Sequence, residues 1–558
     1  MFFRLLPTRP VRAPGALYWQ VTRRRVRARN RLLAASASLP FVYDIWISTF
    51  ERLPELAAAA PSKIEVWSWR PKFSILLYRV PGVTEAQVRQ SVRSVERQIY
   101  RSWELIDCSA SPSDAHMTQS QGDYVIPLCA GDLLSELALF RYAEALQSDR
   151  SVAILYGDQD ELSRQGGRRK PWFKPRWNSE MFLALDFLSR AVAIRCALAS
   201  RVGLGPGTIT RERLAAALLQ ATADPDGSIV HVPHILSHTQ PRPDGAEAAH
   251  RSTAVAEYVR PLGGTCTSGP FGTAKVGWPL PSPSPKVSVI IPTKDKIELV
   301  RACVESVLAL TRYDPFEVIV VDNGSVVPET LAYLEEIAAH PSVRVLPYEA
   351  PYNFSAINNF AARQAAGSFL CLLNNDTEVV EPEWLTEMMR YAVQPHVGAV
   401  GAKLLYEDGT IQHAGVVVGV GNAAGHAHRF APADQPGYFR QPHVAQFVSA
   451  VTAACLVVRK DKYEAVGGLD ERNLAVAFND VDLCLKLQEA GWKNVYVPHA
   501  VLLHHESKSR GSDFAPDRVE QYRRELKTLQ QRWGTETYQD PLHNPNLDRY
   551  SETYVVKI

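Results

Sequence analysis

The stretch PKVSVIIPTK, residues 285–294, is a basic-proline lead into a short strand of β-branched and aliphatic residues. The same opening occurs earlier as PKFSILLYRV, residues 71–80. Each copy is followed by an amphipathic helical pattern, VRQSVRSVERQI from Val88 and VRACVESVLALT from Val300, and then by further strand patterns. Strands that alternate with amphipathic helices are typical of βαβ units. The repeat therefore predicts an α/β fold of two tandem domains, each with a mixed, mostly parallel sheet flanked by helices.

A Gly/Pro/Ser-rich segment, Pro261 to Pro285, separates the two copies and is expected to break any regular element. A chain of 558 residues with 46% apolar composition can bury several cores, so its length favours two or three domains over one. The expected organisation is a basic N-terminal arm (1–68), a first domain (69–245), a linker (246–284), a second domain (285–512), and a C-terminal helix and tail (513–558).

The bulk charge is nearly balanced, with 61 Lys and Arg against 59 Asp and Glu, which argues against a generic nucleic-acid binder and against disorder. The eight cysteines show no C-x-x-C spacing, so neither a disulfide framework nor a zinc site is predicted. The N-terminal arm is nevertheless strongly basic, because the first acid, Asp44, is preceded by Arg4, Arg9, Arg12, Arg23, Arg24, Arg25, Arg27, Arg29 and Arg31.

The basic arm bears on where the protein acts. It lacks the small-residue cleavage site of a secretory signal, so we expect a cytoplasmic protein. The best candidate for a membrane span, residues 32–50, is interrupted by a proline and an aspartate. Two interpretations stay open. Arginines next to Phe41, Trp46 and Phe50 suit a peripheral contact with anionic lipid, and the same segment suits a solvated helix packed on the first domain.

Polar side chains follow the predicted strands of the second copy. In open α/β sheets, ligands bind outside the carboxyl ends of the strands. Asp295, Asp322 and the run Asn374–Asp376 all lie at such ends and are candidate site residues. For Asp322 a second interpretation is equally good, an Asx-type turn with Gly324.

Asp376 is less easily explained by local structure. The helix that follows has its own start signal at Glu381 and Pro382, so it does not need Asp376 as a cap. A carboxylate left over at a strand end favours a hard cation that prefers oxygen ligands. Another strand-like run ends with His504 and His505, and two histidines near a proposed cation site favour a ligand role.

The segment AFNDVDLCLKLQEAG predicts a helix with Asn479 as its N-cap and Gly491 as its stop. Asp480 and Asp482 fall in the first turn, where acids pair favourably with the helix dipole. Asp482 also occupies the capping-box position, which favours a structural role. Asp480 is the better candidate for a general base in the cleft.

At this point the chain from Lys286 to about Gly511 resembles a family 2 glycosyltransferase with the GT-A fold. Tandem two-domain members of this family are associated with bacterial surface polysaccharides, often with rhamnose-containing chains. The residues that carry the resemblance, in order, are VSVIIPTKD, VIVVDNGS, NNDTEV, AACLVVRKDKYEAVGGLD, FNDVDLCLKLQEAG and HHES.

The resemblance implies a nucleotide-diphosphate sugar as donor and a glycan or lipid-linked glycan as acceptor. NNDTEV takes the place of the family's D-x-D motif, so Asp376 would hold a divalent cation, Mg²⁺ or Mn²⁺, with His504 as a second ligand. Here the first acid of the motif is replaced by an amide, which removes one negative charge. The residues implied for donor binding are Thr293, Asp295 and Asp322 at the nucleoside and Asn374 and Asn375 at the ribose or sugar hydroxyls.

Asp480 matches the second acid of the family's acid-acid motif, whose first acid is here Asn479. The resemblance implies that Asp480 deprotonates an acceptor hydroxyl, which displaces the diphosphate directly and inverts the anomeric configuration. The segment Gly425–Arg429 lies where family members build the acceptor side, and its two histidines are either sugar contacts or parts of an ordinary loop.

The first copy departs from this pattern. Aligned by the repeat, Ser109 stands near the place of Asp322, and TITRERL (208–214) stands where FNDVDL carries the base. Gly131 takes the place of Asp376, with Asp132 one position late. We therefore predict a degenerate first domain without transferase activity, whose aromatic residues pack against an acceptor glycan: Trp172, Phe173 and Trp177.

The leading hypothesis is thus a metal-dependent inverting glycosyltransferase that extends a bacterial glycan. The alternative is a non-catalytic carbohydrate-binding or scaffold subunit of a polysaccharide assembly complex, against which the joint presence of Asp322, Asp376, Asp480 and His504 argues. A nucleotide-dependent dehydrogenase is disfavoured, because no G-x-G-x-x-G follows the first strand of either copy.

Overall fold

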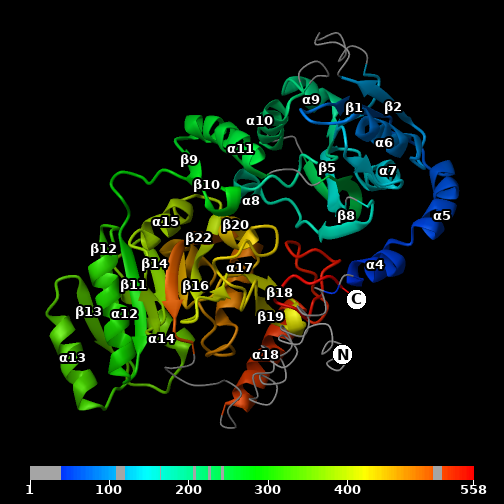
Figure 1. The fold of residues 1–558 in the computed structure, drawn as a ribbon. Helices are drawn as coiled ribbons and strands as arrows, with labels where there is room; N and C mark the ends of the chain where they lie inside the picture. The colour runs from blue at the N-terminus through cyan, green and yellow to red at the C-terminus, as the bar shows by residue number, and fades with distance from the viewer. Residues whose placement is uncertain are drawn as a thin grey trace. The chain divides into compact units, whose positions relative to one another are not determined.

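The computed structural model describes residue 39 and residues 41–108, 120–163, 165–204, 209–223, 228–240, 244–506 and 518–557. The predictions for the arginine-rich residues 1–38 and for Ser109 therefore lie outside the described residues, as does the side chain of Arg211 in the segment TITRERL, which takes the place of the base motif in the first copy. The chain forms two compact units (Figure 1). Unit 1 comprises the chain up to Val276 with His543–Asp548 and Val555–Ile558, and unit 2 comprises Gly277–Leu542 with Arg549–Tyr554.

The main sheet of unit 2 has the order β13-β12-β11-β14-β21-β16-β22-β15. The first four strands are parallel to one another, β21 is antiparallel to both of its neighbours, and β16 and β22 are parallel. The bounds are β11 (Val287–Thr293), β12 (Phe316–Asp322), β13 (Val343–Pro347), β14 (Phe369–Leu373), β15 (Thr377–Val379), β16 (Val397–Leu405), β21 (Cys455–Arg459) and β22 (Lys493–His504).

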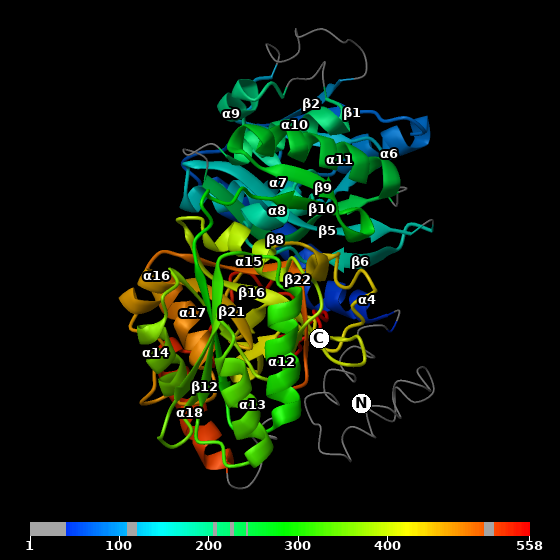
Figure 2. The same cartoon turned by 90° about the vertical axis from the view of Figure 1, so that its left-hand side faces the viewer.

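Helices cover both faces of this sheet (Figure 2). One apolar core lies between the sheet and α12 (Ile297–Leu310), α13 (Pro328–Ala338) and α15 (Trp384–Ala392). A second core lies on the other face, under α14 (Phe354–Gln364), α16 (Lys460–Ala465), α17 (Asn479–Glu489) and α18 (Val519–Trp533). Strands buried on both faces explain the continuous apolar runs in the sequence.

The sheet of unit 1 has the order β2-β1-β3-β7-β5-β8-β4. Position by position this order matches β12-β11-β14-β21-β16-β22-β15, with the same parallel and antiparallel pairings. The predicted α/β fold with two tandem, mostly parallel sheets is therefore confirmed. The strand bounds are β1 (Phe73–Tyr78), β2 (Trp103–Asp107), β3 (Tyr124–Cys129), β4 (Leu133–Leu134), β5 (Val152–Leu162), β6 (Arg168–Trp172), β7 (Ala193–Arg195) and β8 (Ser228–Thr239).

In the chain, the helices of unit 1 come before β1, between these strands and, for α11, after β8. A single core joins β1, β3 and β5 to α6 and α7. The helix bounds are α4 (Val42–Trp46), α5 (Leu53–Glu65), α6 (Glu85–Glu96), α7 (Ala138–Ser148), α8 (Ser179–Ala184), α9 (Cys196–Arg201), α10 (Arg211–Thr222) and α11 (Asp244–Val259). No helix among the described residues is long and apolar enough to cross a membrane.

A buried polar pair also recurs in both sheets. In unit 2, the Ser288 hydroxyl donates to Glu317 Oε1 (2.6 Å) and accepts from the Gly367 amide (2.9 Å). In unit 1, the Ser74 hydroxyl contacts Glu104 and the Gly122 amide in the same way. A Cβ at Gly367 would lie 2.7 Å from the Ser288 amide nitrogen, so only glycine lets the chain approach the pair.

The prediction that the segment Pro261–Pro285 breaks any regular element is wrong. Helix α11 continues to Val259, and β9 (Thr265–Ser268) pairs with β10 (Ala274–Gly277) in a two-stranded sheet. The glycines and prolines that suggested a linker lie mostly in the turns before and between these two strands, where Gly263 has a φ of +76°, and in the irregular segment 278–286 after β10.

Candidate active site

The carboxyl ends of β11, β12 and β14 bring together residues that are distant in sequence. Thr293 and Asp322 are paired in the parallel register of β11 and β12. The Asn375 side chain, just beyond β14, donates from Nδ2 to the Thr293 hydroxyl at 3.0 Å. The structure thus places three of the predicted donor residues at one edge of the sheet.

Ser325 joins the two acids of this edge, Asp322 and Asp295. Its hydroxyl donates to Asp322 Oδ1 (2.6 Å) and accepts from the Asp295 amide (2.8 Å). Asp322 Oδ1 also accepts from the Ser325 amide, so the turn interpretation of Asp322 is confirmed, with Ser325 as the partner. Asp295 Oδ1 accepts from the amides of Val326 and Val327. The sequence did not single out Ser325, although a serine three residues after a strand-end aspartate is typical of such turns.

Asp376 and His504 face one another. Thr377 of β15 is paired with His504 of β22, which brings the preceding Asp376 alongside. The distance from His504 Nε2 to Asp376 Oδ1 is 3.3 Å, and Asn374 Nδ2 lies 3.5 Å from the same ring nitrogen. Both Asp376 and His504 are buried. A carboxylate oxygen and an imidazole nitrogen that face each other at this distance suit the coordination of a divalent cation.

Two further observations concern this pair. Among the described residues, no group of three His, Cys, Asp or Glu side chains could hold a metal ion. The His504 Nδ1 atom is buried and has no hydrogen-bond partner among the described residues. His505 points elsewhere, because its Nδ1 lies 2.6 Å from Glu407 and its Nε2 lies 3.4 Å from Glu378. The second histidine is therefore not part of the predicted ligand set.

Helix α17 begins differently from the prediction. Phe478, with a φ of +61°, precedes the helix, and Asn479 is its first residue and not its N-cap. The Asn479 side chain instead donates to the Ser355 hydroxyl of α14 at 3.1 Å. The left-handed residue turns the chain sharply into the helix, which the sequence does not reveal, since phenylalanine rarely adopts this conformation.

Asp480 lies partly buried at the start of α17. Its Oδ2 accepts from the Ala453 amide (3.1 Å), and its Oδ1 accepts from the Val481 amide (2.8 Å). Burial raises the pKa of the Asp480 carboxyl above its usual value, although both amides oppose the shift. A carboxylate of raised pKa is a better proton acceptor, so the electrostatics suit a general base.

Asp482 has a structural role, by contacts other than those predicted. It is fully buried, and its Oδ1 accepts from Arg532 Nη1 (2.7 Å) and Trp533 Nε1 (2.9 Å) of α18. Lys486 Nζ lies 3.2 Å from its other oxygen. The capping-box interpretation is wrong, because the carboxylate points to a neighbouring helix and not to the amide ends of its own.

The segment Gly425–Arg429 is more buried than a surface loop. His426 ends β19 (Ala424–His426) and its Nδ1 contacts the Gln412 carbonyl at 2.9 Å, while His428 stacks on Tyr554 at 4.3 Å between ring centroids. Burial lowers the pKa of His426 to about 3. Residues 427–429 form a turn, as the ordinary-loop interpretation expects, whereas Gly425 and His426 belong to a strand, and the buried His428 ring faces protein.

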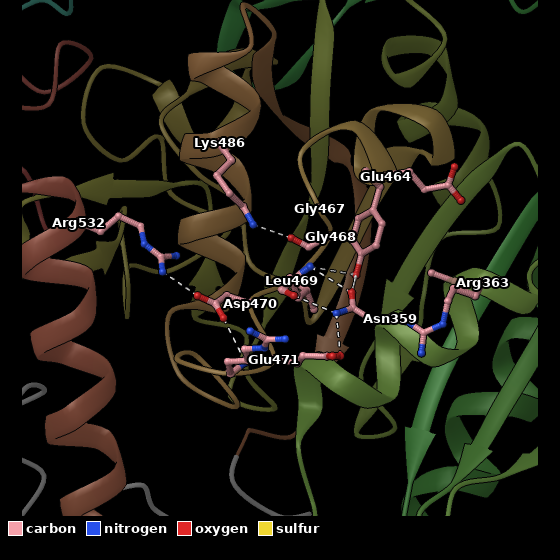
Figure 3. A pocket seen from close by; sticks show the side chains of 13 residues that line it. Asn359, Arg363, Glu464, Gly467, Gly468, Leu469, Asp470, Glu471, Lys486 and Arg532 are labelled. Carbon is pink, nitrogen blue, oxygen red and sulfur yellow. Dashed lines mark hydrogen bonds and ion pairs between the residues drawn. The ribbon is translucent and has the colours of Figure 1, made fainter.

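The described pocket on unit 2 lies away from the predicted site residues. It measures about 470 Å³ and opens between α14, the turn 467–472, Lys486 of α17 and Arg532 of α18 (Figure 3). Its polar groups largely satisfy one another, as Arg532 does with Asp470 at 2.7 Å. None of the residues predicted to bind donor, metal or acceptor lines it.

Unit 1 has a counterpart of the Asp376 and His504 pair. Leu133 of β4 is paired with His238 of β8, just as Thr377 is paired with His504, so Asp132 and not Gly131 corresponds to Asp376. The alignment that placed Gly131 there is corrected by one residue, because β3 is one residue longer than β14 while the turn that follows has three residues in both units.

The carboxylate of Asp132 is paired within its own unit. Arg190 Nη1 lies 2.8 Å from its Oδ2, and the Gln240 amide donates to its Oδ1. Counted back from the paired residues Arg195 and Arg459, Arg190 stands where unit 2 has Ala454. The Asp132 carboxylate of unit 1 is therefore paired with a guanidinium at a position where unit 2 has an alanine.

Of the three aromatic residues predicted to offer a sugar platform in unit 1, two are core residues and Trp177 is half-buried. Trp172 and Phe173 are buried, and Phe173 packs on Trp46 at 4.8 Å. Trp177 packs on Phe182 at 5.4 Å. The glycan-binding role predicted for Trp172 and Phe173 is wrong, because their faces meet protein and not solvent.

Comparison with known proteins agrees with the geometry. Residues 288–428 match the sequence model of the family described as Glycosyl transferase family 2. The chain is 37% identical over 506 residues to the uncharacterized protein y4gI of Sinorhizobium fredii, covering 82% of this chain and 56% of that protein. It is 34% identical over 567 residues to the O-antigen biosynthesis protein RfbC of Myxococcus xanthus, covering 91% of this chain and 44% of that protein.

A third relative is the N-acetylglucosaminyl-diphospho-decaprenol L-rhamnosyltransferase of Mycobacterium tuberculosis, 28% identical over 236 residues, which cover 37% of this chain and 72% of that protein. Among solved structures, the mannosyltransferase PcManGT from Pyrobaculum calidifontis in complex with GDP-Man and Mn²⁺ is 15% identical with a TM-score of 0.33, covering 47% of this chain and 67% of that one.

The match of residues 288–428 to this family model confirms the resemblance seen in the sequence. The chain spans about half the length of the first two relatives.

Proposed function

We propose that the protein is an inverting, metal-dependent glycosyltransferase that moves a sugar from a nucleotide-diphosphate sugar to a growing bacterial polysaccharide. The observation that carries the proposal is a two-residue link between the proposed metal and base residues. The Ala454 carbonyl accepts from the Asn374 amide (3.1 Å), and the Ala453 amide donates to Asp480 (3.1 Å). These contacts hold Asp480 beside the motif of Asp376, as a displacement reaction requires.

In this mechanism Asp480 takes the proton from an acceptor hydroxyl, whose oxygen attacks the anomeric carbon from the side opposite the diphosphate. The raised pKa of Asp480 favours this proton transfer. Thr293, Asn375 and Asn374 orient the donor through hydrogen bonds, and Asp295 and Asp322 keep the turn that receives the nucleoside in place. No carboxylate nucleophile is required, because a single displacement inverts the configuration.

Asp376 and His504 would hold a Mg²⁺ or Mn²⁺ ion, with the remaining ligands from the donor diphosphate and water. When bound, such an ion supplies Lewis-acid stabilisation of the leaving diphosphate. The donor atoms fit, since His504 Nε2 and Asp376 Oδ1 are 3.3 Å apart. The residues that fit a cation and a base argue against the alternative of a non-catalytic scaffold.

The proposal extends to location. We propose a cytoplasmic protein that contacts the inner face of the plasma membrane, where a lipid-linked acceptor would lie. Support comes from α4, whose inner side chains Val42 and Trp46 are buried while Phe41 and Ile45 are 51% and 45% exposed. Preferential binding to phosphatidylglycerol vesicles over phosphatidylcholine vesicles, lost when Arg23, Arg24 and Arg25 are replaced by alanine, would test it.

The experiment for the main proposal uses the full chain. We would incubate it with dTDP-L-rhamnose, UDP-N-acetylglucosamine and GDP-mannose, with Mn²⁺ or Mg²⁺, and measure donor hydrolysis and thermal shift. Metal-dependent hydrolysis of one donor is the expected result. A chain that binds none of these donors and hydrolyses none of a wider panel would favour the scaffold instead.

A further inference from the structure

The residues of unit 2 that follow the family match are not a passive extension. The match ends at residue 428, whereas α18 and residues 534–554 come later in the chain. Two carboxylates in this C-terminal part, Asp540 and Glu552, are buried in unit 2. A buried carboxylate is retained at a cost unless it is fully hydrogen-bonded, so its partners indicate what it holds.

Asp540 ties two segments together. Its Oδ2 accepts from the Val418 amide (2.8 Å) of β18 (Val416–Val418), and its Oδ1 accepts from the Ser449 hydroxyl (2.8 Å). Its Oδ1 also accepts from the Leu542 amide (2.9 Å), which fixes the turn of the C-terminal part itself. One carboxylate therefore joins the β18-β19 hairpin, residue 449 and its own turn.

Glu552 holds the other strand of the hairpin. Its Oε1 accepts from the His426 amide at 3.1 Å, and its carbonyl accepts from the His428 amide at 2.8 Å. Arg429 Nη1 lies 3.9 Å from the same carboxylate oxygen. Two residues later, the Tyr554 ring stacks on His428 with planes only 2° apart. Asp540 thus holds β18 and Glu552 holds β19, so both strands of the hairpin are bound to the C-terminal part.

The hairpin leads on to Asp480 through hydrogen bonds. Val416 pairs with Ala450 in an isolated bridge, which joins β18 to residues 449–453. His413 Nε2 lies 3.3 Å from the Thr452 amide nitrogen, and the next amide, that of Ala453, holds Asp480. A displacement of the hairpin would therefore reach the proposed base, whereas Thr293 is held separately, by Asn375.

We infer that Asp540 and Glu552 are positioning residues for the acceptor side of the site. They hold the hairpin and residues 449–453, which flank Asp480, in the geometry that receives the acceptor hydroxyl. The inference rests on the proposed function, in which Asp480 is the base. It assigns to the C-terminal part a role in acceptor use, distinct from donor binding at the strand ends.

The variants are Asp540→Asn and Glu552→Gln in the full chain, which keep side-chain size but remove the charge that strengthens the hydrogen bonds. Glu536→Gln is the matched control, because Glu536 is an exposed carboxylate of the same C-terminal part. Acceptor use would be measured with p-nitrophenyl glycosides of rhamnose and of N-acetylglucosamine, and donor use by hydrolysis of the nucleotide sugar without acceptor.

We expect the acceptor KM to rise roughly tenfold or more in both variants, the factor given by the loss of one charge-assisted hydrogen bond, with donor hydrolysis within about twofold of wild type. The control should match wild type. Equal losses of donor hydrolysis and transfer, or an unchanged acceptor KM, would overturn the inference.

A second measurement does not depend on activity. Amide hydrogen exchange should become roughly tenfold faster in residues 411–429 of both variants, and stay unchanged in β11 and β12. If wild type hydrolyses no donor, the proposed function fails, but the exchange result still decides whether these carboxylates hold the hairpin. Unchanged exchange at 411–429 would show that they do not, and if Asp540→Asn fails to fold, Glu552→Gln alone decides.

Discussion

Unit 1 and unit 2 build the same sheet and fill its edge differently. In both units an acid comes directly before a short strand whose first residue is paired with a histidine. The acid and the histidine are Asp132 and His238 in unit 1, and Asp376 and His504 in unit 2. In unit 2 the acid and the histidine face each other at 3.3 Å. In unit 1 each has another partner, since Asp132 pairs with Arg190 at 2.8 Å and His238 contacts Asp160 at 2.6 Å. Unit 1 therefore keeps the carboxylate of this edge but pairs it with an arginine of its own.

A similar substitution occurs at the base. In unit 2 the Ala453 amide donates to Asp480, which comes from α17. In unit 1 the amide at the corresponding position, that of Ser189, donates to Asp186 from three residues earlier. The amide is satisfied locally and no acid from the following helix is needed. These two contacts support the prediction that unit 1 has no transferase activity. At the metal position the Arg190 guanidinium pairs with Asp132, and at the base position the Ser189 amide donates to Asp186.

The largest expected effect concerns the cation. Excess EDTA should abolish transfer, and Asp376→Ala should raise the metal concentration needed for half-maximal activity steeply, because a Lewis acid contributes several kcal/mol to such a transition state. Asp132→Ala in unit 1 should leave the metal requirement unchanged. The assay is transfer rate against Mn²⁺ concentration. Full activity in EDTA would contradict the proposal that the sheet edge of unit 2, unlike that of unit 1, holds a catalytic cation.

The next effect concerns the base. Asp480→Asn should lower turnover by about 10²-fold or more with donor binding nearly intact, since general-base help is worth about that factor. Asp186→Asn should leave turnover of the folded protein unchanged. Asp482→Asn is the control within α17, and we expect it to lower the melting temperature more than the rate, because it loses a buried contact to Arg532. Equal rate losses at Asp480 and Asp482 would show that the base is wrongly assigned.

Much of this comparison could be predicted from the sequence, and the reasons for the misses are specific. The repeat predicted the two sheets, because short local patterns mark both the buried strands, in residues 71–80 and 285–294, and the amphipathic helices that follow them. Asp376 and His504 were predicted to meet from the family motif. Arg190 was missed because it pairs with a residue 58 positions away, and no local pattern marks such a partner. The burial of Trp172 was missed because sequence alone does not say which face of an aromatic residue meets the core.

A third prediction concerns the pair of Asp132 and Arg190 at the sheet edge of unit 1. Arg190→Ala leaves the Asp132 carboxylate buried without its cation, which should lower the free energy of unfolding by about 3 kcal/mol, the low end for breaking a buried pair. Mn²⁺ should restore part of this loss if the edge still accepts a cation. Urea unfolding with and without Mn²⁺ measures both. Lys170→Ala is the matched control, since its pair with Glu161 is exposed and is worth at most about 1 kcal/mol.

The smallest effect comes from Glu506, which stands two residues after His504 as Gln240 stands two residues after His238. Burial alone would raise the pKa of Glu506, but the Arg429 guanidinium and the Tyr406 hydroxyl outweigh it and hold the pKa at about 2. A carboxyl with a lowered pKa stabilises the fold above its ordinary pKa, and this contribution is lost as the pH falls toward 2. Glu506→Gln, which copies unit 1, should therefore lower the free energy of unfolding by about 2 kcal/mol near pH 7, after allowance for solvent screening. The difference between variant and wild type should shrink below about pH 4.5, where the unfolded carboxyl binds its proton. Chemical unfolding at pH 7, 5 and 3.5 measures it, and a difference that does not change with pH would mean that the ion pair with Arg429 does not hold the end of β22.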